Sequence, residues 1–469
     1  MNDQTRTLPQ GPALPGWAQT IAFSRRPYDF IRECSRRFGD TYTLNIAGMG
    51  DIVMFSSPEA IRAIFALPGD GLHNGNDVVR YLLNERSVVF LEGKSHHKTR
   101  QVLSTPLNGK ALHSYAPSFL AATRHISSTW KDGQLVNLQH AFQEITFDAL
   151  MQATFGETQL TGYSELRREL LAFVNGQLTN EMFFASVLLG SRLYDLIRGR
   201  ADRAKQALQN GKDTQQFGLF AKRAVNLARV EYLLEKMVAE RRAQTHNGTD
   251  ALSRMLQSGD ISEHDIVQQL ITILVAGHDT TSLALSWVMF QVLQRPAVLQ
   301  RLLDELQTAQ TADGLDAQVV DKLPWLGAVI HESLRVTPGA AFVPRRLDQD
   351  VEISGITVPA GICLAANVIG AHSRDATWGD AERFRPERFL EQDITAWMFL
   401  PFGGGIRRCL GAAFAITEMR LVFAHLLTSW NFTFVPGYQA RPAVHGFLIG
   451  PAKSLQVLVN RKNINHIVK

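Results

Sequence analysis

Apolar residues recur every three to four positions along most of the chain, which predicts a mainly helical protein. The longest such stretch runs from Ser262 to Gln294. It opens with a capping box formed by Ser262 and Asp265 and ends before Pro296. The 32 residues after the cap would span roughly 48 Å at the helical rise per residue. Alternating, strand-like segments are few: residues 41–46, 52–55, a hairpin around Ser354-Gly355, 432–435 and 455–459. We therefore expect a mainly α fold with small β-sheets.

The middle of this long helix, residues 270–285, is apolar on both sides of a polar run, His278-Asp279-Thr280-Thr281-Ser282. A membrane span is one alternative. An ionised aspartate at a bilayer centre costs about 3 kcal/mol, so a core helix of a soluble protein is favoured. Buried polar groups usually have hydrogen-bond partners or a function, and the run is therefore a candidate site.

Composition narrows the class of protein. Hydrophobic residues make up 45% of the 469 residues and charged residues 20%, which is typical of a globular protein with a sizeable core. Lys and Arg (48) exceed Asp and Glu (44) only slightly and are spread along the chain, so nucleic-acid binding is not expected. The three cysteines, Cys34, Cys363 and Cys409, are widely spaced, which favours a reducing compartment over a disulfide framework.

The chain organisation is predicted to be simple. Residues 1–37 lack the apolar core of a signal peptide, so we expect an N-terminal extension without a membrane anchor. No linker, repeat or low-complexity segment divides residues 38–469, which predicts a single domain.

A glycine-lined loop near the C-terminus, residues 402–411, presents Cys409 at the start of an apolar helical stretch. Gly403, Gly404 and Gly405 would let backbone N–H groups approach the sulfur, and a helix N-terminus would face it; both effects lower a cysteine pKa. The alternative is a buried, inert cysteine. Phosphate-loop and papain-type patterns are not present in the sequence.

Phe402, Gly405, Arg407, Cys409 and Gly411 match the pattern Phe-x-x-Gly-x-Arg-x-Cys-x-Gly at every specified position. This is the haem-binding signature of the cytochrome P450 family, which the chain resembles from about residue 38 to the C-terminus. The resemblance implies a cytochrome P450 fold that holds haem b, with Cys409 as the axial thiolate on the iron. It also implies that Arg407 meets a haem propionate, that Phe402 packs against the sulfur, and that Gly403 and Gly411 lie against the cofactor.

Residues 276–281, Ala-Gly-His-Asp-Thr-Thr, are similar to the family's oxygen-activation motif. By this resemblance Asp279 and Thr280 are catalytic and relay protons. His278 points about 100° away on a helix and is interpreted as structural. The alternative for the pair is a threonine bonded to a carbonyl one turn earlier and an aspartate paired with an arginine.

Three further groups match family positions. Glu332 and Arg335 lie three apart on a helix and, with Arg388, resemble a buried structural network. His96 and Arg100 lie one helical turn apart and would bind a propionate, with His97 as an alternative to His96. Arg345 would bind a propionate too, and Arg346 competes for that role.

The resemblance also implies an apolar substrate pocket and a mobile lid over residues 183–220. The predicted pocket residues are Leu274, Ala276, Gly277, Ala340, Ala341, Phe342 and Phe447.

These observations predict a haem-thiolate monooxygenase of the soluble bacterial type. It would insert one oxygen atom from O₂ into a lipophilic small molecule, by hydroxylation or epoxidation of a fatty acid, terpenoid, steroid or similar compound. Because no fused reductase is expected, electrons would come from ferredoxin and ferredoxin reductase or from flavodoxin, in the cytoplasm. Lys94, Lys98 and Arg408 would steer an acidic partner. The alternative is a haem-thiolate protein that binds ligands or is driven by peroxide, without O₂-dependent monooxygenation.

Overall fold

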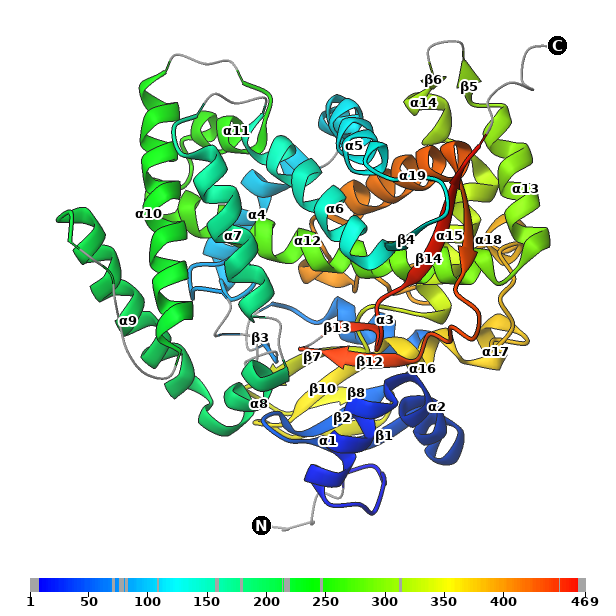
Figure 1. The fold of residues 1–469 in the computed structure, drawn as a ribbon. Helices are drawn as coiled ribbons and strands as arrows, with labels where there is room; N and C mark the ends of the chain where they lie inside the picture. Colours follow the sequence, from blue (N-terminus) through cyan, green and yellow to red (C-terminus); the bar gives the residue numbers. More distant parts are fainter. Residues whose placement is uncertain are drawn as a thin grey trace.

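The computed structural model in Figure 1 is mostly helical, with small sheets gathered mainly at one end. The structure describes residues 8–69, 72–75, 80, 83–107, 109–156, 160–177, 180–212, 214, 220–244, 248–311, 314–446 and 448–462. The predicted fold class, mainly α with small β-sheets, is confirmed.

The helices are distributed along the whole chain. They are α1 (Gly16–Arg25), α2 (Pro27–Phe38), α3 (Pro58–Ala66), α4 (Gly93–Leu107), α5 (Lys110–Ser128), α6 (Leu138–Phe155), α7 (Tyr163–Gln177), α8 (Asn180–Leu189), α9 (Ser191–Gln209), α10 (Ala221–Ala243), α11 (Ala251–Ser258), α12 (Glu263–Leu293), α13 (Pro296–Gln307), α14 (Ala317–Val320), α15 (Pro324–Val336), α16 (Val368–His372), α17 (Asp375–Trp378), α18 (Arg388–Glu391) and α19 (Ala412–Ser429). The predicted lid region contributes α8 and α9, and its residues 213 and 215–219 lie outside the described residues.

The strands form one larger sheet and several short ones. The five-stranded sheet has the order β1 (Thr41–Ile46), β2 (Gly50–Phe55), β10 (Cys363–Asn367), β7 (Phe342–Leu347) and β3 (Leu72–Asn74). The remaining strands pair as β11 (Trp430–Phe434) with β14 (Gln456–Arg461) and β4 (Gln134–Asn137), β12 (Pro442–His445) with β13 (Leu448–Pro451), β5 (Gln310–Thr311) with β6 (Gly314–Leu315), and β8 (Val351–Ile353) with β9 (Ile356–Val358). The strand segments predicted from the sequence all correspond to observed strands.

Strand β7 was not expected, because Pro344 lies inside it and proline cannot donate to a strand ladder. In the structure Pro344 pairs with Ala365 of β10, and β7 runs antiparallel to both β10 and β3.

Helix α12 begins as predicted. Ser262 Oγ accepts the Asp265 N–H at 3.1 Å and donates to Asp265 Oδ2 at 2.6 Å. The helix crosses the molecule and packs against α6, α10, α15 and α19 (Figure 1). It is long and apolar enough to cross a membrane, but 78% of its apolar window is buried within the protein. A core helix is therefore the better description.

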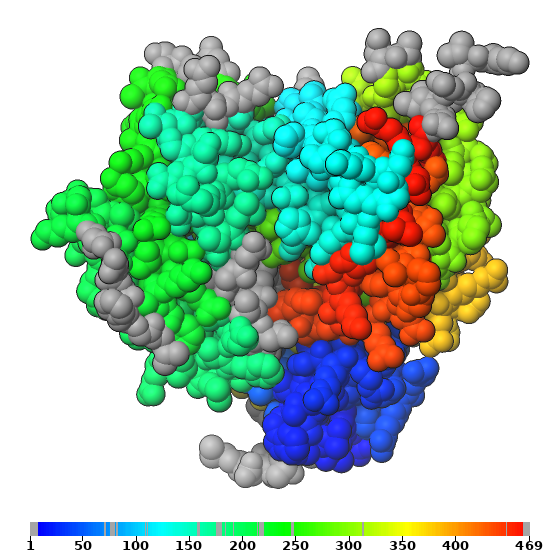
Figure 2. All heavy atoms as spheres, in the orientation of Figure 1, coloured from blue at the N-terminus to red at the C-terminus, as the bar shows by residue number. Residues whose placement is uncertain are grey.

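Residues 16–38, predicted as part of an N-terminal extension, form α1 and α2 and pack against β1. Figure 2 shows these residues in blue at one end of the molecule, next to residues of the C-terminal strands in red. The sheet end and the helical end meet around α12 and the loop before α19, where the predicted site residues lie.

Candidate active site

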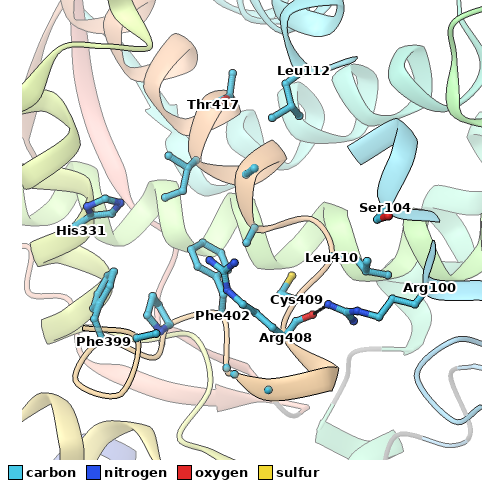
Figure 3. A pocket seen from close by; sticks show the side chains of 18 of the residues that line it. Arg100, Ser104, Leu112, His331, Phe399, Phe402, Arg408, Cys409, Leu410 and Thr417 are labelled. Carbon is cyan, nitrogen blue, oxygen red and sulfur yellow. Dashed lines mark hydrogen bonds between the residues drawn. The ribbon is translucent and has the colours of Figure 1, made fainter. Parts of the chain in front are cut away.

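The loop that carries Cys409 is closed by its own backbone. The Cys409 N–H donates to the Phe402 carbonyl at 2.9 Å, and the Arg408 N–H donates to the Gly405 carbonyl at 3.1 Å. A 3₁₀ turn over Gly405–Arg407 precedes the thiol, and α19 starts three residues after it. This geometry places Cys409 beside the N-terminus of α19 (Figure 3).

The glycines of the loop allow a close approach to α3. A Cβ on Gly404 would lie 2.3 Å from the Phe65 ring, and one on Gly405 would lie 2.7 Å from the Phe65 carbonyl oxygen. Gly405 also has a φ of +65°, which disfavours any other residue. These two glycines therefore seat the loop on α3. The N–H that reaches the Cys409 sulfur belongs to Gly411, not to the Gly403–Gly405 run that the sequence suggested.

Cys409 is solvent-accessible, although protein surrounds the thiol closely. Burial raises its pKa, and the Gly411 N–H, Arg100 and Arg408 offset this effect only in part. The expectation that the loop alone lowers the pKa is wrong, because loss of solvation outweighs one N–H and two nearby arginines. A bound metal cation would favour a thiolate at this position.

The accessible face of Cys409 opens into a cavity of about 1160 Å³. Its lining includes Phe402, Gly403 and Leu410 of the loop, together with Arg100, Arg408 and Arg420 (Figure 3). The predicted substrate-pocket residues that the structure describes are not among those that line this cavity.

Four basic side chains gather from three separate segments beside the loop: His96 and Arg100 of α4, Arg345 of β7, and Arg407. Burial and the nearby Arg407 and Arg100 lower the pKa of His96 to about 4. Burial and Arg407 lower the pKa of Arg345 to about 10. Burial is the larger cause of both shifts, and the contribution of neighbouring arginines shows that basic side chains lie close together here.

The arginines of this cluster donate to backbone carbonyls. Arg407 bonds Val89 and Leu91 at 3.1 and 2.8 Å, Arg345 bonds Pro344 at 2.8 Å, and Arg100 bonds Arg408. Among the described residues none of these arginines forms an ion pair. Burial lowers the pKa of Arg407, and Glu92 lies near enough to oppose this shift, although no ion pair joins them in the described part of the chain. This concentrated positive charge fits an anionic ligand such as the haem propionates. An accessible thiol and this cationic cluster together suit haem b.

The members of the two pairs of alternatives left by the sequence have different surroundings. His96 is buried and lies within the cluster, whereas His97 is exposed and lines the cavity. Side chains alternate along β7, so Arg345 lies in the cluster while Arg346 donates to the Gly361 carbonyl at 3.2 Å.

Helix α12 is buried along most of its length, yet Ala276 and Thr280 are exposed, one turn apart. They define an accessible stripe on an otherwise buried helix. Thr280 Oγ1 donates to the Ala276 carbonyl at 2.7 Å, which is the back-bonded arrangement weighed as an alternative.

Asp279, next to this stripe, is buried and faces α6. Its Oδ1 accepts a hydrogen bond from Gln143 Nε2 at 2.9 Å and lies 3.6 Å from His278 Nε2. No described arginine pairs with it. Gln143 was missed in the sequence because it lies 136 residues away on α6, with no local pattern to single it out.

The predicted pocket residues have different surroundings. Leu274 and Ala341 are buried, and Phe342 packs its ring 6.0 Å from Phe23 of α1. A Cβ on Gly277 would lie 2.8 Å from Leu150, so this glycine allows α6 to approach. Ala340 is half-buried, Ala276 is exposed, and Phe447 lies outside the described residues.

Glu332, Arg335 and Arg388 meet in the core beneath the Cys409 loop. Arg335 binds Glu332 through two hydrogen bonds, and Arg388 Nε lies 3.6 Å from Glu332 Oε1. The two arginines also donate to carbonyls of the segment from His372 to Arg383.

Comparisons with known proteins agree with this arrangement. The family model for cytochrome P450 matches residues 9–459. Cytochrome P450 135B1 of Mycobacterium tuberculosis (strain ATCC 25618 / H37Rv) is 28% identical over 462 residues, covering 96% of this chain and 91% of that protein. Cytochrome P450 138 of the same strain is 27% identical over 463 residues, covering 97% of both.

Solved structures share the fold. Retinoic acid bound cyanobacterial CYP120A1 superimposes with a TM-score of 0.79 at 23% identity, covering 97% of this chain and 100% of that chain. The cytochrome P450DA heme domain gives a TM-score of 0.78 at 18% identity over 98% of each chain. The chain therefore belongs to the cytochrome P450 family, whose members are haem b-dependent monooxygenases.

Proposed function

We propose that this enzyme inserts one atom of O₂ into a lipophilic small molecule, by hydroxylation or epoxidation of a fatty acid, terpenoid, steroid or similar compound. The observation that carries the proposal is the accessible stripe of Ala276 and Thr280 on a buried helix, with the acid Asp279 directly beside it. A small side chain leaves room for a ligand, and an acid next to an alcohol can deliver protons to it.

The residues that would hold the cofactor belong to the Cys409 loop and to the basic cluster beside it. Cys409 would supply the thiolate that holds the iron, and His96, Arg100, Arg345 and Arg407 would bind the propionates. Phe402, Gly403 and Gly411 would contact the cofactor through the closed loop. When bound, haem with a thiolate ligand supplies the chemistry of O–O bond cleavage.

The remaining steps belong to protein side chains. Thr280 would orient a proton at its Oγ1 after its bond to the Ala276 carbonyl is released, and Asp279 would replace that proton. Gln143 holds Asp279 by a hydrogen bond to Oδ1, which fixes the direction from which the carboxyl group acts. Leu274, Ala276, Gly277, Ala340, Ala341, Phe342 and Phe447 would shape the substrate pocket.

Electrons would arrive from a separate protein, ferredoxin with its reductase or flavodoxin, in the cytoplasm. The predicted steering residue Arg408 supports an acidic partner, since it is exposed and lines the cavity beside Cys409. Lys94 is exposed, whereas Lys98 forms an ion pair with Asp260 at 3.5 Å and is the weakest of the three predicted steering residues. We further propose that residues 38–469 act as one haem domain.

The thiolate assignment is tested by the spectrum of the reduced protein with carbon monoxide. We expect the red-shifted Soret band of thiolate ligation, and we expect Cys409→Ser to abolish it. A protein without this band, or a variant that retains it, overturns the proposal.

Oxygen activation is tested separately with Thr280→Ala and an accepted substrate, identified by displacement of iron-bound water in a lipophilic library. Product formed per NAD(P)H consumed should fall several-fold in the variant. Unchanged coupling would instead favour the alternative, a ligand-binding or peroxide-driven protein.

A further inference from the structure

His278 is a buried histidine without a hydrogen bond. Its side chain is 1% exposed, and neither Nδ1 nor Nε2 has a hydrogen-bond partner among the described residues. A neutral imidazole carries one donor and one acceptor, so leaving both unpaired inside a protein is costly. Groups of this kind in a native structure call for an explanation.

Packing alone does not explain the histidine. The His278 ring meets Phe147 of α6 in an edge-to-face contact, with centroids 5.2 Å apart. A phenylalanine would keep such a contact without burying two polar nitrogens. The imidazole therefore has a cost in stability that its ring contact does not offset.

The charged groups around His278 lie on two sides. Asp279 Oδ1 is 3.6 Å from Nε2 on the same helix. Asp148 of α6 is close enough to raise the pKa of His278, against the stronger lowering by burial. Asp148 is held by Arg167 of α7 through bonds of 2.8 Å from Nε and 2.7 Å from a terminal nitrogen.

The ion pair of Asp148 and Arg167 is partly exposed to solvent. The Asp148 and Arg167 side chains are 19% and 36% exposed, whereas Asp279 is 9% exposed. Asp148 follows Phe147, whose ring contacts His278, so the partly exposed Asp148–Arg167 pair lies near the histidine, and Asp279 and the accessible Thr280 follow His278 on α12.

We propose that His278 is a positioning residue that reloads Asp279 with protons drawn from solvent at the Asp148–Arg167 pair. The inference rests on the proposed roles of Asp279 and Thr280. After Asp279 gives up its proton toward Thr280, His278 Nε2–H protonates Oδ1, and Nδ1 takes one proton from the solvent side. One proton enters at Nδ1 and one leaves from Nε2, no electrons move, and the ring is left as the Nδ1–H tautomer. It returns to the Nε2–H tautomer when Nδ1 gives its proton to water and Nε2 takes one from water. The 3.6 Å separation shortens to a hydrogen bond during transfer, as catalytic contacts often do.

His278→Phe and His278→Gln, in the haem-containing protein, test this role. We expect His278→Phe to lower product formed per NAD(P)H by about tenfold and to change the solvent deuterium isotope effect on turnover. Product formation driven by added hydrogen peroxide should persist, because it bypasses the delivery of protons to O₂. His278→Gln keeps hydrogen-bonding groups, so its product formed per NAD(P)H should lie between the values of the original protein and of His278→Phe. Asp148→Asn should reproduce part of the loss from outside the active site.

Two controls separate this role from a structural one. Ser286→Ala removes a buried hydrogen bond from the same helix, to the Ser282 carbonyl at 2.9 Å, and should leave coupling and the isotope effect unchanged. Nitrogen NMR of ring-labelled histidine, assigned by the loss of signals in the His278 variants, reads proton exchange without turnover. Exchange at the His278 ring should be faster than at buried α12 amides and should slow in Asp148→Asn.

The outcomes show whether a failure concerns the proton relay through His278 or the proposed oxygen activation by Asp279 and Thr280. If Asp279→Asn lowers coupling while His278→Phe, His278→Gln and Asp148→Asn all match the original protein, or if ring exchange does not respond to Asp148→Asn, the relay through His278 is wrong. If Asp279→Asn and Thr280→Ala also leave coupling unchanged, the proposed oxygen activation fails instead.

Discussion

Glu332 and Arg335, three residues apart on α15, form a two-pronged ion pair in a fully buried setting. Arg335 Nε donates to Oε2 at 2.7 Å, and a terminal nitrogen donates to Oε1 at 2.8 Å. The two side chains are 0–1% exposed. The remaining guanidinium nitrogen donates to the carbonyls of His372 and Ala381, so this pair connects α15 to the segment that leads to the Cys409 loop.

Replacing this arginine should destabilise the fold. Arg335→Lys keeps the charge but loses the planar fork, and we expect a loss of about 3–5 kcal/mol in the free energy of unfolding. Urea unfolding followed by circular dichroism and by haem absorbance measures it. Arg36→Lys is the control, because its pair with Glu382 is exposed and should contribute less than about 1 kcal/mol. Equal effects of the two substitutions would contradict a special role for the buried pair.

Gly405→Ala should impair haem incorporation. The new Cβ would lie 2.7 Å from the Phe65 carbonyl, and the φ of +65° strains any other residue, so the loop must leave α3. Haem content per protein after expression measures the effect. Gly437→Ala is matched in backbone angle, with a φ of +79°, but its Cβ would meet nothing within 4 Å. It should cost about 1 kcal/mol and leave haem content unchanged.

His96→Gln should weaken haem retention about tenfold, because a buried imidazole N–H beside the three arginines is lost. The rate of haem transfer to an acceptor protein measures retention. His97→Gln, adjacent but exposed, should behave like the original protein. The reverse order would assign the propionate contact to His97.

The stability contributed by His73 should depend on pH. Its Nδ1 lies 2.5 Å from Glu92 Oε1 and its Nε2 2.7 Å from Asp348 Oδ2, and the hydrogen bond to Glu92 is the main cause that raises its pKa. A raised pKa means that the folded state binds the proton more tightly. The contribution is therefore fully present below about pH 6.5, the ordinary histidine value, and is lost as pH rises through the folded-state pKa.

Thermal unfolding of the original protein and His73→Gln at pH 6 and pH 8.5 checks this. The difference in Tm should be larger at pH 6 and should shrink at high salt, since the three side chains are 40–56% exposed. A difference that grows with pH would contradict the assignment.

Local sequence signals predicted a large part of the fold and the site. The Ser262 cap fixed the start of α12 because the capping hydrogen bond joins residues three apart. The Cys409 loop could also be recognised from local sequence, because the hydrogen bond that closes it joins Phe402 and Cys409, which lie within one short motif.

Long-range relationships could not be read in the same way. Gln143 meets Asp279 from another helix, and Phe65 determines why Gly405 is a glycine. The pKa of Cys409 was misjudged because loss of solvation depends on the assembled surroundings rather than on neighbours in sequence. Strand β7 was missed because Pro344 weakens the local signal, whereas its pairing with β10 and β3 depends on distant segments.

The alternation of β7 has a consequence for how this chain can vary in length. Arg345 and Arg346 point to opposite sides, so inserting or deleting one residue between Gly339 and Arg345 would present the wrong guanidinium to the cluster. Inserting or deleting two residues would return the Arg345 side chain to the correct side of the sheet but shift its position along the strand. We expect this connection to tolerate substitution far better than any change in residue number.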